Sequence, residues 1–100
     1  MIAQVSQHGS ILVLRDNTGS QINTILIGNG EFLGHSGKFV VIQYGDMIVT
    51  MNENQSILGR IVLDSRYRIS GITDSGFHAK TGSMIIAYNS MCEHINSFSV

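Results

Sequence analysis

The stretch Gly37–Met51 constrains the fold of this chain most. It reads GKFVVIQYGDMIVTM, in which the short apolar runs FVVI and MIV flank the dipeptide Tyr44-Gly45. Runs of β-branched and aromatic residues around a two-residue break that contains glycine are typical of a β-hairpin. With Tyr44-Gly45 as the loop, Ile42 pairs with Met47 and both faces of the hairpin are largely apolar. We therefore expect this hairpin at the centre of the fold, covered on each side.

Similar segments occur along the rest of the chain. We expect a first hairpin from residues 2–6 and 10–15 around His8-Gly9, a third strand at 22–27, strands at 57–63 and 66–72, and a last hairpin from 77–80 and 83–88. Polar clusters such as Asp16-Asn17-Thr18-Gly19 separate these segments and are typical of turns.

The C-terminal segment has a different pattern. Ser90-Met-Cys-Glu93 matches a helix capping box, and Met91, Ile95 and Phe98 then fall at helical spacing on one stripe. This pattern predicts a short helix or helical turn over residues 91–98, whose apolar stripe covers an open end of the β-structure. The alternative is that the stripe contacts a neighbouring chain.

The spacing of three glycines suggests an internal repeat. Gly9, Gly45 and Gly82 each follow a strand and lie 36 and 37 residues apart. Residues 9–27 align with 45–63 without a gap, but only four of these nineteen positions are identical. Either the chain contains a duplication, or hairpins with the same turn constraint look alike. A β-propeller would need more blades than a chain of this length holds.

Together these patterns predict one all-β domain over residues 1–100. We expect a compact antiparallel sandwich or small barrel of about eight or nine short strands, with the short C-terminal helix or helical turn.

Composition limits the classes of function. Six Lys and Arg against seven Asp and Glu argue against bulk electrostatic binding of nucleic acid and leave little repulsion between copies. No apolar run approaches the roughly 20 residues of a membrane helix, and the N-terminus does not resemble a signal peptide. We expect a cytoplasmic protein or part of a non-membrane assembly. One cysteine, Cys92, permits no internal disulfide.

A basic strand face is the first candidate site. In the hairpin 66–80, with Ser70 opposite Lys80, the side chains of Arg66, Arg68, His78 and Lys80 share one outward face. Such a face is suited to a phosphate or another anion, because arginine offers a two-pronged donor. The alternative is an ordinary solvated strand face, and no aromatic residue lies among these charges to stack a base.

The second candidate is the connection Gly28–Gly37, which has four glycines in ten residues and is predicted to be a flexible loop. Its end, Gly34-His35-Ser36-Gly37, is the candidate functional loop. It lacks the pattern of a phosphate-binding loop and leads into a strand rather than a helix, so a plain connection is the alternative.

No motif in the sequence indicates an enzyme. The four histidines and Cys92 match no zinc spacing, and Ser36 lacks the surroundings of a nucleophile elbow, so we predict no catalytic residue, metal or cofactor. The first hypothesis is a non-enzymatic structural or assembly domain that forms a homo-oligomer or docks on a protein partner. The second is a small binding module for an anionic ligand, nucleic acid or a charged glycan, which uses the basic face.

Overall fold

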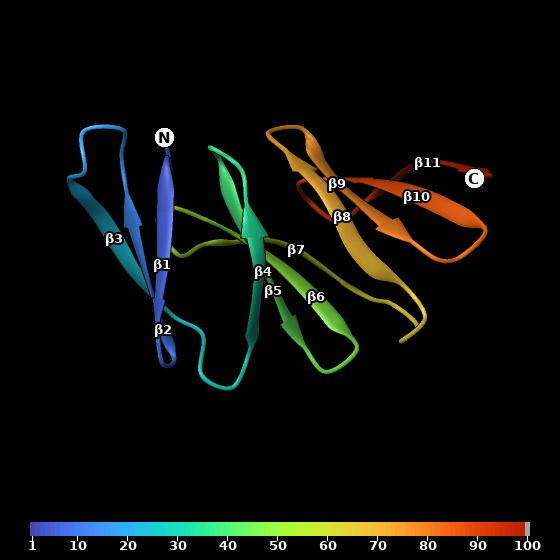
Figure 1. Cartoon of the computed structure of the whole chain (residues 1–100), viewed down its shortest axis with the longest axis horizontal. Helices are drawn as coiled ribbons and strands as arrows, with labels where there is room; N and C mark the ends of the chain where they lie inside the picture. The colour runs from blue at the N-terminus through green and yellow to red at the C-terminus, as the bar shows by residue number, and fades with distance from the viewer. Residues whose placement is uncertain (100) are drawn as a thin grey trace.

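The computed structural model describes residues 1–99, which form eleven antiparallel strands in three small sheets (Figure 1). The first sheet contains β1 (Gln4–His8), β2 (Ile11–Arg15) and β3 (Gln21–Leu26). The second contains β4 (Glu31–His35), β5 (Phe39–Tyr44), β6 (Met47–Asn52) and β7 (Ile57–Val62). The third contains β8 (Arg68–Thr73), β9 (Gly76–Lys80), β10 (Met84–Asn89) and β11 (His94–Ser99).

Every regular element of the described residues is a strand, which confirms the all-β class, and the three sheets follow one another along the chain. Within each sheet the strands pair in chain order, and the last strand leads to the first strand of the next sheet. The described residues contain no helix and no closed barrel, so the expected barrel and C-terminal helix are wrong. No helix in this part of the chain has the length and apolar character needed to cross a membrane.

The second sheet is packed between the other two, and the central hairpin β5–β6 is covered on both faces as predicted (Figure 1). Between the first and second sheets lie Leu12, Leu14, Ile25, Val40, Ile42 and Val49. Between the second and third lie Phe39, Val41, Ile48, Phe77, Ala79 and Tyr88. We call the face of the first or second sheet that is directed toward the next sheet in the chain its forward face, and the opposite face its rear face. In the third sheet the rear face is the one that packs on the second sheet, and the forward face is the one turned away from it.

The loop of the central hairpin lies one residue later than expected. Tyr44 pairs with Met47, so the two loop residues are Gly45 and Asp46. Gly45 has φ +63°, and a positive φ at the first loop position is the feature that requires glycine in a type II′ turn. The first hairpin is shifted in the same way, with His8 paired to Ile11.

The three sheets repeat one unit. A side-chain oxygen of Asp16, Asn52 or Asn89 accepts hydrogen bonds from the backbone N–H groups two and four residues later, in the turn before β3, β7 or β11. These three residues lie 36 and 37 positions apart, like the three glycines. The repeat is therefore a property of the whole unit, although the first sheet has no counterpart of β4 and β8.

The predicted C-terminal helix is replaced by a turn and β11. Asn89, not Ser90, accepts the hydrogen bond from the N–H of Glu93, and Cys92 has φ +61°. Tyr88 pairs with His94 and Ala87 with Asn96, so Ile95 is an extra residue in a β-bulge. The three-residue spacing of Ile95 and Phe98, which looked helical, belongs to this bulged strand.

Candidate functional site

The basic face predicted on β8 and β9 is present, with a different register. Arg68 pairs with Lys80 and Ser70 with His78, and all four side chains are exposed on the forward face of the third sheet. The expected pairing of Ser70 with Lys80 is wrong. The chain reverses after Thr73, which pairs with Gly76, and the register of β8 shifts between Ser70 and Thr73.

Arg66 precedes β8 and is not part of the strand face. Its backbone N–H donates to Asp64 Oδ1 at 2.9 Å, and its Nε and Nη2 donate to the two carboxylate oxygens at 3.2 and 3.3 Å. These hydrogen bonds, first the one from the backbone, hold the pKa of Asp64 below its ordinary value. The Arg66 side chain is 79% exposed, so this ion pair contributes little to stability.

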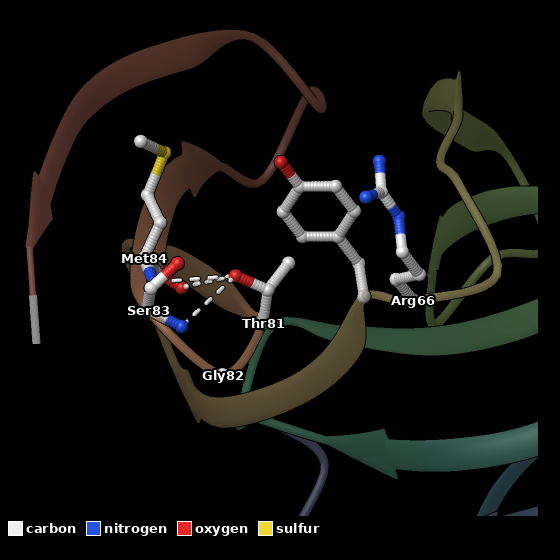
Figure 2. Close-up of a pocket in the computed structure, with 6 residues that line it drawn as sticks. Arg66, Thr81, Gly82, Ser83 and Met84 are labelled. Carbon is white, nitrogen blue, oxygen red and sulfur yellow. Dashed lines mark hydrogen bonds between the residues drawn. The ribbon is translucent and has the colours of Figure 1, made fainter.

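Two open clefts lie beside these residues. One, of 450 Å³, is bordered by Arg66, Arg68, Ile69, Ser70, Lys80, Thr81 and Gly82. The other, of 580 Å³, lies beside the loop between β9 and β10 (Figure 2). There Thr81 Oγ1 accepts hydrogen bonds from the backbone N–H groups of Ser83 and Met84, at 3.4 and 3.2 Å. These two bonds fix the conformation of the loop.

The structure thus brings three of the four predicted basic residues to one cleft. His78 is separate, because its ring lies edge-on to Phe98 with 6.2 Å between the ring centres. Arg68 and Lys80 face solvent from adjacent strands, and Arg66 borders the same cleft. An anion in this cleft would meet donors that are exposed and screened by water.

The candidate loop Gly34–Gly37 is not a flexible loop. Gly34 and His35 belong to β4, and a Cβ atom at Gly34 would lie 2.7 Å from Ile72 Cδ1 of β8. Glycine is used here because the second and third sheets approach closely at these two strands.

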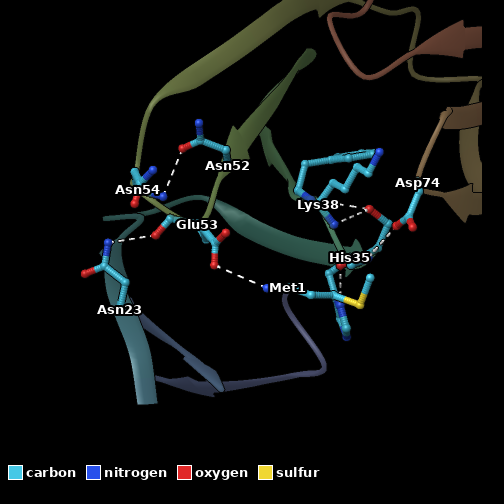
Figure 3. Close-up of polar contacts among 11 residues, drawn as sticks. Met1, Asn23, His35, Lys38, Asn52, Glu53, Asn54 and Asp74 are labelled. Atoms are coloured by element: carbon cyan, nitrogen blue, oxygen red, sulfur yellow. Dashed lines mark hydrogen bonds and ion pairs between the residues drawn. The ribbon is translucent and has the colours of Figure 1, made fainter. Parts of the chain in front are cut away.

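Ser36 and Gly37 form a tight turn whose polar groups bond to neighbours, next to Lys38 and Asp74 (Figure 3). The Ser36 side chain is 9% exposed, and its Oγ accepts the N–H of Lys38 at 3.0 Å. The N–H of Gly37 donates to Asp74 Oδ1 at 2.8 Å. The carboxylate of Asp74 therefore bonds to the backbone of this turn.

Among the described residues no three His, Cys, Asp or Glu side chains lie close enough together to hold a metal ion. Cys92 is buried beside Thr50, and burial raises the pKa of its thiol. Burial of this kind disfavours the thiolate, which is the reactive form of a cysteine.

An exposed apolar patch lies on the forward face of the third sheet, where the sequence predicted an apolar stripe on a helix. Phe98 is 43% exposed and Ile95 is 60% exposed, with Ile85 half-buried beside Phe98. We expected Ile95 and Phe98 to cover the end of the β-structure as a helix. The repeat spacing is the signal that could have identified the patch, since the equivalent residues of the other two sheets lie in the cores.

Comparison with known proteins identifies the fold but no family. No protein-family model matches the sequence, and no curated protein matches it. The structure is similar to that of a protein of unknown function from Bacteroides caccae, with a TM-score of 0.62 and 9% sequence identity over 95% of this chain. The similar region spans 39% of that protein. At this identity the similarity shows the arrangement of strands and nothing about activity.

Proposed function

We propose that this chain is a non-enzymatic structural or assembly domain that acts through self-association. The observation that carries the proposal is the apolar patch of the third sheet. Ile95 and Phe98 are exposed, whereas the equivalent residues in the first two sheets pack against a neighbouring sheet. Exposed apolar surface of this kind, on an otherwise ordered sheet, is typical of an interaction surface.

Low charge supports the same function. The formal net charge is −1, so copies of the chain repel each other weakly. Sedimentation equilibrium from low to high micromolar concentration tests the proposal. We expect a discrete oligomer whose fraction rises with concentration, and a strictly monomeric mass throughout would contradict self-association.

A second candidate function is binding of an anionic ligand at the basic cleft. It is favoured by one observation, the placing of Arg66, Arg68 and Lys80 along the same 450 Å³ cleft. The test is retention on heparin or on an immobilised oligonucleotide as a function of salt. Replacing these three residues with serine should abolish salt-sensitive retention and leave thermal stability nearly unchanged, because exposed charges contribute little.

A matched control removes the same number of charges elsewhere. Arg15, Lys38 and Arg60 lie outside the cleft, so their triple serine variant should keep its retention. Equal loss in both variants would indicate a nonspecific charge effect and would exclude a site at this cleft.

A further inference from the structure

The forward face of the third sheet is equivalent to two faces that are already covered. The last strand of each sheet, β3, β7 or β11, contains one bulge residue at the equivalent position, which is Ile22, Leu58 or Ile95. Three residues after the bulge comes a second apolar residue, which is Ile25, Ile61 or Phe98. In the first sheet these residues contact the second sheet, and in the second sheet they contact the third. Only in the third sheet are they exposed to solvent.

The two sheet junctions have the same direction. In each, the forward face of one sheet packs on the rear face of the next. Among the described residues the rear face of the first sheet is the one rear face that no other sheet covers. Its central residue is Val13, which is half-buried and equivalent to the buried Val49 of the second sheet.

The second and third sheets approach most closely at their first strands, β4 and β8. Among strands of different sheets, β4 and β8 make the most extensive backbone approach, and Gly34 provides the space for it. Sheets that converge at one edge form a fan, and continued addition of sheets to a fan closes a ring. Rings of this type contain about four to eight four-stranded sheets.

From these three features we propose that a second copy of this chain covers the exposed face. The forward face of the third sheet would receive the rear face of the partner's first sheet, and a second identical seam would close a head-to-tail ring. Each chain has three sheets, so two copies supply six, within the usual range, whereas three copies would supply nine. This inference rests on the proposed self-association and specifies its surface and symmetry.

Charge disfavours the other arrangement, in which two forward faces meet. That arrangement would bring Arg68 and Lys80 of both copies into one interface, while the carboxylate of Glu93, at the end of the same sheet, is already hydrogen-bonded to the amide of Asn89. In the head-to-tail seam this basic set occurs once. It lies opposite a mixed face that contains Gln4, Ser6 and Arg15 together with the exposed apolar side chains of Ile11 and Leu26. Because Arg15 is also basic, added salt should strengthen the association.

The experiment is sedimentation equilibrium of the full chain and three variants. Phe98→Ser alters the forward face of the third sheet, Val13→Ser alters the rear face of the first, and Val62→Ser is the control. Val62 is apolar and 72% exposed, and it lies on the outer strand of the second sheet, away from both faces. We expect a dimer whose dissociation constant rises at least tenfold in each of the first two variants and is unchanged in the control.

Circular dichroism establishes that each variant is folded. If Val13→Ser unfolds, Ser6→Lys replaces it, because that change adds bulk and charge to the same face without removing apolar contacts. Small-angle scattering of the dimer adds a measurement of shape. The maximum dimension of a closed ring should stay close to the 41 Å length of one chain, whereas an end-to-end pair would be nearly twice as long.

The outcomes separate the ring from the proposed function. A dimer that is sensitive to Phe98→Ser but not to Val13→Ser or Ser6→Lys would overturn the ring and leave self-association intact. An oligomer that none of the variants affects, or an oligomer larger than a dimer, would also overturn the ring and leave self-association intact. A monomer at every concentration would overturn both proposals.

Discussion

Replacing Thr50 with valine tests how the second and third sheets are joined. Thr50 is fully buried in β6, and its Oγ1 donates a hydrogen bond to the carbonyl oxygen of Ser90 at 2.6 Å. Ser90 belongs to the turn between β10 and β11. Valine preserves the shape of the side chain but leaves this carbonyl without its donor at a tightly packed junction.

We expect the free energy of unfolding to fall by about 1–2 kcal/mol, because loss of the hydroxyl leaves the partly buried carbonyl of Ser90 without a donor. For a domain of this size each kcal/mol corresponds to a decrease of about 4–8 °C in Tm. Urea denaturation and thermal unfolding, both followed by circular dichroism, measure the change.

The control is Thr24→Val on β3. Thr24 is an exposed strand residue, so this substitution reports the intrinsic effect of exchanging a hydroxyl for a methyl in a strand. Its effect should stay within about 0.5 kcal/mol of zero. If Thr50→Val were as stable as the original protein, or more stable, the hydrogen bond to Ser90 would not hold the two sheets together.

Three further predictions concern a close approach, a turn and the cysteine. Gly59→Ala should destabilise the protein by about 1–3 kcal/mol in urea denaturation, because a Cβ atom would overlap the backbone carbonyl of Met91. A neutral result would place the β10–β11 turn away from β7. Gly45→Val should cost more than about 1 kcal/mol, since φ is +63° and the surrounding space is open, so backbone strain alone is measured. Gly45→Asn, which tolerates this φ better, should cost less. Burial raises the pKa of Cys92, so the unfolded thiol loses its proton first and stability should fall as pH rises above about 8.5. Urea midpoints at pH 7 and 9.5 measure this fall, and Cys92→Ala should lack that part of it.

The central hairpin could be predicted because its sequence is consistent at every level. Val40 and Val41 point to opposite faces, and both are fully buried, one toward each neighbouring sheet. An apolar run of this kind has no stable position except between two layers. The exact loop was harder to predict, because glycine adopts positive φ at either loop position and only the pairing of Tyr44 with Met47 decides between them.

Two strands escaped prediction because glycine and spacing misled the reading of the sequence. β4 contains Gly34, which suggested a loop, yet the structure uses that glycine for contact with Ile72. In β11 the bulge at Ile95 shifts the apolar residues to a three-residue period. Period alone cannot separate a bulged strand from a helix, and only pairing with β10 resolves the difference.

The candidate sites were predicted with uneven success. The shared face of Arg68, His78 and Lys80 follows from strand alternation, which a change of register by two residues preserves. The exposure of Phe98 depends on whether another sheet packs against the forward face of the third sheet. That relation is set by the stacking of whole units, so it could not be read from the local pattern.

The junctions between sheets explain why the repeat is nearly hidden in the sequence. At the first junction the amide of Asn23 donates to the carbonyl of Glu53 at 2.8 Å (Figure 3). Gly59 and Ser90 are the equivalent residues of the second junction. There the turn packs directly on Gly59, which has no side chain to donate, and the hydroxyl of Thr50 supplies the hydrogen bond instead. At each junction the equivalent backbone carbonyl accepts a hydrogen bond, but the donor comes from a different strand. What the repeat conserves is therefore the position of a donor in space, and not the residue at one position of the sequence.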